Sequence, residues 1–195
     1  FEDLDNPIEL FRKWFSKAEK SEINDPNAVA VATSNKDNQP NVRMVLLKGL
    51  SEKGFVFYTN FNSKKGEELK ENQKASMCFH WKSLRRQVRA IGKVEQVSDK
   101  EADDYFNSRP YKNRIGAWAS SQSKILDKRE TFLKNIKEFE TKFPDQKNVP
   151  RPPHWSGWRL LPDEIEFWLD GDGRIHERLN YRKNNNKWIK ELLYP

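Results

Sequence analysis

The chain has 195 residues, of which 35% are hydrophobic and 33% are charged, and its formal net charge is +7. This length fits one domain with a sizeable core, and an aromatic share of 12% with seven tryptophans argues against disorder. The excess of Lys and Arg favours anionic partners, such as phosphorylated small molecules, nucleic acid or an acidic surface.

Several common classes are excluded. The single Cys78 allows no intramolecular disulfide framework or Cys-rich metal site, and it fits a reducing cytoplasm. No apolar run approaches the roughly 20 residues of a membrane span, and no signal peptide is visible. His80, His154 and His176 lack metal-ligand spacing, and the sequence has no glycine-rich nucleotide loop or serine elbow. We therefore expect a cytoplasmic protein without a metal.

The amino-terminal half is predicted to be a helix followed by short strands. Asn6 as N-cap, Pro7 at the first helical position and Glu9 at the capping-box position indicate a helix over 6–20. Ser63 is the expected N-cap of a short polar helix. Apolar runs between turn residues predict strands over 28–33, 41–48, 55–59, 75–81 and 86–97.

The second half is predicted to begin with helices and to end with strands. A capping box over 98–101 starts a helix that Pro110 ends, 115–119 is a short apolar segment, and Asp127 caps a further helix. Strands are expected over 155–161 and 165–169. A further strand is expected to begin at Arg174, and a last one to end at Leu193. The fold class is therefore mainly β with peripheral helices, a closed antiparallel barrel in one domain over 1–195.

Arg43 and Lys48 bracket the apolar run of the second strand. They are five residues apart, so on an unbroken strand they point to opposite faces, which suits two separate anions. The alternative is a core strand whose end cations extend to water. Lys64 and Lys65 follow the Ser63 cap, where free N–H groups and cations favour phosphate, although such pairs are usually just solvated.

Two further groups of residues are candidates for anion binding. Tyr105 and Arg109 are four residues apart and share one face of the predicted helix. They can bind an anion together, or they can form an ordinary stacked pair. Arg174, His176 and Arg178 alternate onto one strand face, where their mutual repulsion is best relieved by an anion or an electron-rich ring. The alternative is a solvated edge strand balanced by nearby carboxylates.

Six blocks occur in a fixed order and together resemble the pyridoxamine 5′-phosphate oxidase family, from about Pro7 to the C-terminus. They are 43–48 (RMVLLK), 57–60 (FYTN), 86–89 (RQVR), 105–110 (YFNSRP), 115–118 with 122–123 (IGAW and QS), and 166–168 with 174–178 (EFW and RIHER). The resemblance implies an FMN-binding split β-barrel that forms a homodimer with FMN at the subunit interface. It also implies oxidation of pyridoxamine or pyridoxine 5′-phosphate to pyridoxal 5′-phosphate, with O2 reduced to hydrogen peroxide.

The resemblance also assigns residues. The FMN contacts would be Arg43, Met44, Val45, Leu46, Leu47, Lys48, Tyr58, Thr59, Lys64, Lys65, Gln87, Gln122, Ser123, Trp168 and Arg178. The substrate phosphate would meet Lys48, Tyr105, Arg109 and Asn113, while Arg174, Ile175 and His176 would meet the pyridine ring. Arg174 and His176 are the expected catalytic residues.

The chain departs from the family pattern at four positions. Lys64 stands where Arg is usual, Asn113 where Ser is usual, Arg114 where Gln is usual, and Glu177 where Asp is usual. Two alternatives stay open: another split-barrel flavoprotein with a different substrate, and a basic nucleic-acid-binding barrel.

Overall fold

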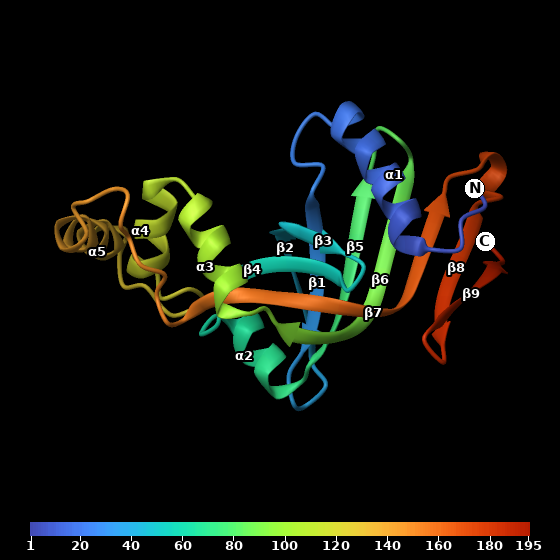
Figure 1. Ribbon diagram of the computed structural model, residues 1–195. Helices are drawn as coiled ribbons and strands as arrows, with labels where there is room; N and C mark the ends of the chain where they lie inside the picture. The colour runs from blue at the N-terminus through green and yellow to red at the C-terminus, as the bar shows by residue number, and fades with distance from the viewer.

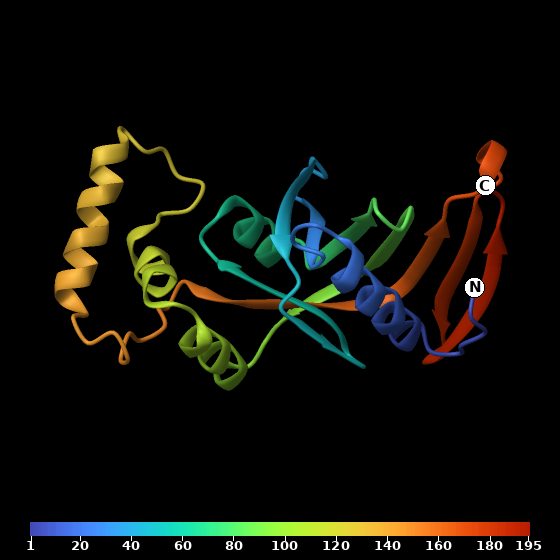
Figure 2. The same ribbon diagram turned by 90° about the horizontal axis from the view of Figure 1, so that it is seen from above.

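The computed structural model describes residues 1–195, and a curled, nine-stranded antiparallel sheet forms its centre (Figures 1 and 2). The strands are β1 (Ala28–Ser34), β2 (Pro40–Leu46), β3 (Gly49–Ser51), β4 (Gly54–Asn60), β5 (Lys74–Trp81), β6 (Arg86–Gln96), β7 (Trp155–Leu169), β8 (Glu177–Asn184) and β9 (Lys187–Leu193). The helices are α1 (Pro7–Ser21), α2 (Lys64–Glu71), α3 (Asp99–Ser108), α4 (Tyr111–Ala119) and α5 (Arg129–Lys142), with a 3₁₀ turn η1 at Asp172–Arg174.

The sheet curls without closing. Its strand order is β2-β1-β5-β6-β7-β4-β3, and β8 and β9 extend it from β7. The strands at the two ends of this order, β2 and β3, do not pair with each other, although only Leu47 and Lys48 separate them in sequence. The closed barrel expected from the number of strands is therefore wrong, and the sheet is the open, antiparallel form.

The predicted amino-terminal helix is confirmed, with α1 packed on the main core. Asn6 Oδ1 accepts a hydrogen bond from the Ile8 N–H at 2.9 Å, and Pro7 occupies the first turn, as the sequence indicated. Phe11 is fully buried between Phe55 and Phe79, with ring centroids 4.9 Å from each. This contact fixes α1 on the sheet.

Helices α3, α4 and α5 lie together at one end of the molecule, around a smaller core that includes Phe106, Ile115 and Trp155 (Figure 2). The apolar segment expected over 115–119 is the second half of α4. Lys128, not Asp127, precedes α5 at the N-cap position, and no residue of α5 is fully buried. Its apolar side chains only partly cover the core below.

Strand β7 connects the two ends of the molecule (Figure 1). The two strands expected over 155–161 and 165–169 are one strand of 15 residues, with a register shift against β6 between Ile91 and Gly92. Trp155 and Trp168 are 13 positions apart along it, which is about 40 Å at the usual rise of an extended strand. β7 thus separates the helical end from the β8–β9 end.

The segment before β8 differs from the prediction. Strand β8 begins at Glu177, and Arg174 has a left-handed φ of 65° in the turn η1. Arg174, His176 and Arg178 therefore do not alternate on one strand face. The reason is a closed loop: a Cβ on Gly171 would lie 2.0 Å from the Ile175 carbonyl oxygen, so the chain folds back on itself there.

Candidate active site

One cavity, of about 780 Å³, brings together many of the predicted site residues. It lies between the end of β2, β4, α2, α3, α4 and the start of β7. The predicted residues in its lining are Met44, Val45, Leu46, Lys48, Tyr58, Thr59, Lys65, Tyr105, Arg109, Asn113 and Gln122. Four cations line it, Lys48, Lys65, Arg109 and Lys112, and no Asp or Glu does. Such a lining favours an anionic ligand.

Lys65 is placed by the first turn of α2. The Ser63 hydroxyl caps the helix by accepting from the Gly66 N–H at 3.3 Å, as predicted. Lys65 is 8% exposed, and its Nζ donates to Thr59 Oγ1 and Gln122 Oε1, both at 3.1 Å. Burial, with the nearby Arg43, lowers the pKa of Lys65 to about 8. Lys65 is thus a buried cation whose hydrogen-bond acceptors are both neutral.

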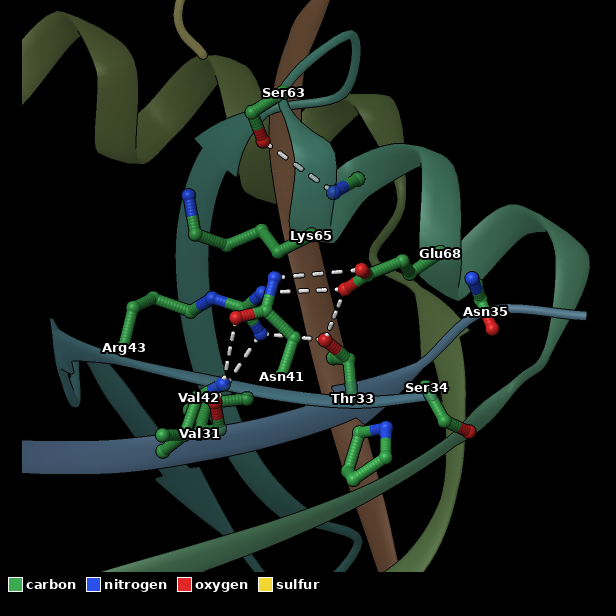
Figure 3. Close-up of polar contacts among 12 residues, drawn as sticks. Val31, Thr33, Ser34, Asn35, Asn41, Val42, Arg43, Ser63, Lys65 and Glu68 are labelled. Carbon is green, nitrogen blue, oxygen red and sulfur yellow. Dashed lines mark hydrogen bonds and ion pairs between the residues drawn. The ribbon is translucent and has the colours of Figure 1, made fainter. Parts of the chain in front are cut away.

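Arg43 is held by a largely buried network that lies next to Lys65 (Figure 3). Its Nη1 donates to the Val31 carbonyl at 3.2 Å and to the Thr33 hydroxyl, and its Nη2 pairs with Glu68 at 3.1 Å. Burial opposes ionisation of Glu68, but hydrogen bonds from Thr33, Asn41 and Arg43 hold the pKa of Glu68 below its usual value. Three of the five guanidinium donors are used, which leaves two for a ligand.

Arg43 and Lys48 do not share one strand. β2 ends at Leu46, and the Lys48 N–H donates to the Val56 carbonyl at 2.8 Å beyond that end. The two cations nevertheless lie in different environments, as the sequence indicated, because Arg43 lies in the network with Glu68 while Lys48 lines the cavity.

An aromatic wall faces the cavity and carries Arg109. Tyr58 stacks on both Tyr105 and Trp155, with centroid distances of 4.1 and 5.3 Å, and the latter two rings are 6.1 Å apart. Burial, with the nearby Glu101, raises the pKa of Tyr58 to about 12, so its hydroxyl stays protonated at neutral pH. The Arg109 guanidinium lies 4.8 Å from the Trp155 ring centroid. Tyr105 and Arg109 are thus both stacked and cavity-lining.

The Arg109 guanidinium has an unused donor. Its Nη1 is buried without a hydrogen-bond partner, and burial lowers the pKa of Arg109. Helix α4 begins two residues later, and no side chain caps its first turn. Lys112 and Asn113 in that turn line the cavity. An orphan guanidinium N–H beside an uncapped helix N-terminus suits a phosphate.

Arg114 does not face this cavity. It is 6% exposed, and its Nη2 donates to the Gln146 carbonyl at 2.5 Å. Its departure from the family pattern therefore fixes α4 to the loop after α5, and the cavity lining is unaffected.

A second cluster of predicted residues lies at the other end of β7. Gln87 and Arg178 flank Trp168 on the neighbouring strands β6 and β8, and the His176 ring lies 4.6 Å from Trp168. Arg178 Nε pairs with Glu166 at 2.8 Å, and Arg89 pairs with the same carboxylate. Burial opposes ionisation of Glu166, but the bonds from Arg178 and Arg89 hold its pKa below the usual value.

The remaining predicted residues lie outside both groups. Leu47 is buried in the main core, whereas Lys64, Ser123, Arg174 and Ile175 are exposed. Gln122 is held by Lys65, but the neighbouring Ser123 does not line the cavity.

A family model described as "Pyridoxamine 5′-phosphate oxidase" matches residues 15–143. A second, "Pyridoxine 5′-phosphate oxidase C-terminal dimerisation region", matches 155–195. The chain belongs to the pyridoxamine 5′-phosphate oxidase family. The pyridoxine/pyridoxamine 5′-phosphate oxidase of Pelagibacter ubique is 58% identical, covering 100% of this chain and 94% of that protein. The one from Sinorhizobium fredii is 54% identical, covering 100% and 95%.

Two solved structures have the same fold. PhzG from Burkholderia lata, in complex with tetrahydrophenazine-1-carboxylic acid, is 30% identical with a TM-score of 0.93, covering 100% of this chain and 95% of that chain. An FMN-binding protein from Nostoc punctiforme, 17% identical, has a TM-score of 0.77 and covers 97% and 98%. The antiparallel split-barrel fold expected from the resemblance is therefore confirmed.

Several cavity residues of this oxidase-family chain were not predicted from the sequence, namely Asn60, Ser108, Pro110, Lys112, Gly116, Ala117, Ser120 and Trp155. Lys112 had a usable signal, because it lies in the first turn of a helix that begins after Pro110. No sequence signal marked Trp155 as a site residue, because it joins the cavity through its contact with Tyr58, which is far away in sequence. No group of three His, Cys, Asp or Glu side chains is arranged for a metal ion, and no helix has the length and apolar character to cross a membrane.

Proposed function

We propose that this chain is an FMN-dependent oxidase that converts pyridoxamine and pyridoxine 5′-phosphate to pyridoxal 5′-phosphate, with O2 as acceptor and hydrogen peroxide as product. The observation that carries the proposal is a cavity lined by four cations, no carboxylate and an aromatic wall, in a chain 58% identical to an oxidase of that name. We also propose a cytoplasmic location, since the free thiol of Cys78 suits a reducing compartment.

The donor set fits the phosphate of FMN. Lys65 is a buried cation with only neutral acceptors, and Arg43 keeps two free guanidinium donors beside it. A phosphate dianion supplies the anionic partner that Lys65 lacks and accepts from the donors of Arg43 that Glu68, Thr33 and Val31 leave free. Thr59, Gln122 and the 44–46 backbone are the other proposed contacts from this protomer. When bound, FMN supplies the acceptor for a hydride from the carbon that bears the amine or alcohol.

A different part of the cavity fits the substrate phosphate. Arg109, Lys48 and the first turn of α4 with Asn113 supply the donors, and none of them shares the hydrogen-bond acceptors of Lys65. The wall of Tyr105, Tyr58 and Trp155 excludes water beside them. These groups would bind and orient the vitamer so that its reactive carbon lies against the cofactor, and that placement lowers the barrier.

The second cluster supports a homodimer with FMN at the subunit interface. In both views β8 lies at one end of the molecule and α3 and α4 lie at the other (Figures 1 and 2). Trp168, at the end of β7, and Arg178 and His176, at and just before the start of β8, are therefore remote from the cavity that α3 and α4 line. They cannot reach a ligand in the cavity of their own chain. The matched dimerisation region includes all three, so we propose that a partner's Arg174, His176 and Arg178 residues complete each site.

The function is tested by mixing the FMN-loaded protein with pyridoxamine 5′-phosphate without oxygen and then admitting air. Bleaching of the flavin absorbance, its return in air and one peroxide per pyridoxal 5′-phosphate formed are expected. A protein that binds FMN but is reduced only by other substrates would instead support a split-barrel flavoprotein of different specificity. A colourless protein with salt-sensitive binding to nucleic acid would support the third alternative.

FMN binding should depend on pH through Lys65. The pKa of about 8 belongs to the free protein, and a bound phosphate raises it, so binding takes up a proton above that pH. Affinity is therefore full below pH 8 and falls as the pH rises through it, by up to about tenfold per pH unit. Fluorescence titration between pH 6 and pH 10, as a rough span around that pKa, measures this. Lys65→Arg should abolish the fall, because a guanidinium stays charged, and an unchanged slope would contradict the role of Lys65.

Arg43 should contribute to stability as well as to FMN binding. The sequence alone suggested that Arg43→Ala would leave the fold intact, but the structure places Arg43 against the buried Glu68. Losing it leaves that carboxylate unpaired, so the unfolding free energy without FMN should fall by about 1–3 kcal/mol in urea titrations. Adding Glu68→Gln should recover part of the loss, since the amide needs no cation. Additive effects of the two substitutions would contradict the coupling.

A further inference from the structure

The loop that joins β7 to β8 holds a histidine against an aspartate carboxylate. The Asp170 N–H donates to the Arg85 carbonyl at 3.1 Å, which fixes the start of the loop on the β5–β6 turn. Gly171 lies so close to the Ile175 carbonyl that no Cβ fits, which closes the loop. Asp170 and His176 therefore face one another across the closed loop.

Both oxygens of the Asp170 carboxylate have partners. Oδ1 lies 3.0 Å from His176 Nδ1, and Oδ2 pairs with the Arg85 guanidinium. The side chains of Asp170 and His176 are 17% and 22% exposed, whereas that of Arg85 is 67% exposed. The other face of the imidazole contacts Trp168, with ring centroids 4.6 Å apart. The ring is thus held at Nδ1 and against an indole.

The surroundings of Nδ1 select one tautomer. The Gly171 N–H also lies 3.3 Å from Nδ1, so an unprotonated Nδ1 would accept from it. In that form a carboxylate oxygen would face the nitrogen lone pair at 3.0 Å, which is repulsive. A protonated Nδ1 instead donates to Asp170 in a charge-assisted bond, about twice as strong as a neutral one. The two contacts favour opposite tautomers, and the shorter, charge-assisted bond to Asp170 outweighs the longer, neutral one from Gly171, so the Nδ1–H form is favoured. Nε2 makes no hydrogen bond within the chain.

We propose that Asp170 is a positioning residue for the oxidation. It holds His176 as the Nδ1–H tautomer against Trp168, so that Nε2 is the atom offered to the substrate, and Arg85 holds Asp170 in turn. The assignment of His176 to the substrate ring rests on the proposed function. The tautomer and its dependence on Asp170 do not, so the two parts can be tested separately.

Asp170→Asn is the decisive variant. An amide at this position donates to Nδ1 and so favours the Nε2–H form, as a carboxylate-to-amide change does in serine proteases. ¹⁵N NMR of histidine-labelled protein reads the tautomer directly, and the chain has only His80 and His154 besides His176. We expect the His176 protonated nitrogen to change from Nδ1 in the parent to Nε2 in the variant. The kcat for pyridoxamine 5′-phosphate should fall about 10- to 100-fold, with FMN affinity unchanged.

Asp172→Asn is the matched control, since Asp172 is an exposed carboxylate in the same loop. It should change neither the His176 signals nor kcat. Arg85→Ala, at an exposed side chain, gives a second variant that should fold and lower kcat in the same direction by a smaller factor. An Nε2–H tautomer in the parent, or an unchanged kcat in Asp170→Asn, would overturn the proposal. A parent that shows the Nδ1–H form but does not oxidise the vitamer would overturn the proposed function alone.

Discussion

Replacing Arg109 by alanine is expected to lower kcat/KM for pyridoxamine 5′-phosphate about 10- to 150-fold, mainly through KM. The reason is the loss of a charge-assisted contact worth about 1.5–3 kcal/mol. Arg109 is suited to this contact because its Nη1 is buried with no acceptor in the chain, beside the uncapped turn of α4. Steady-state kinetics with the phosphorylated vitamer and with unphosphorylated pyridoxamine measure the effect. Only the phosphorylated substrate should lose affinity.

Two controls separate the phosphate contact from general damage. Arg109→Lys keeps the charge but loses the forked donor and the stacking on Trp155, so it should recover only part of the loss. Arg12→Ala removes an exposed arginine of α1 that pairs with Glu52, and its kinetics should match the parent. Equal losses for phosphorylated and unphosphorylated vitamers in Arg109→Ala would show that Arg109 does not bind the phosphate.

The sequence predicted local structure well where a side chain and its own backbone decide it. The caps at Asn6, Ser63 and Ser98 are all present, with hydrogen bonds to the backbone two or three residues later. Their chemistry depends on adjacent residues only, so it can be read from the order of residues. The same holds for β1, β4, β5 and β6, whose bounds lie within a residue of those expected.

The prediction failed where distant contacts decide the conformation. Alternation placed Arg174 and His176 on a strand, but the approach of Gly171 to the Ile175 carbonyl turns the chain before β8 begins. Alternation also split β7 in two, because Pro162 interrupts the apolar pattern while the pairing with β6 continues past a register shift. The candidate site shows the same limit: its residues were found by resemblance, and Trp155 was found only in the structure.

Replacing Arg174 by alanine is expected to raise the activation free energy by about 2–4 kcal/mol, which lowers kcat/KM roughly 30- to 900-fold, while FMN stays bound. Arg174 is exposed in η1 and has no ion-pair partner within the chain, so its loss removes no contact that stabilises the monomer. Arg174→Gly should be equally inactive and no less stable, because glycine suits the φ of 65°. Stopped-flow reduction of bound FMN is the measurement. Arg182→Ala, at an exposed arginine that pairs with Glu191 between β8 and β9, is the matched control and should react as the parent does.

Mixed dimers of the two inactive chains test where Arg174 acts. If Arg174 completes the cavity of its partner, a hybrid of Arg109→Ala and Arg174→Ala chains has one site with both defects and one site with neither. Random pairing makes half of the dimers hybrids, so coexpression should restore roughly a quarter of the wild-type activity, although each parent is nearly inactive. If Arg109 and Arg174 served the same cavity from one chain, every hybrid site would carry one defect and no activity would return. The length of β7 between the two ends of the molecule favours the first outcome, because about 40 Å of strand separates Trp155 in the cavity from Trp168 beside His176.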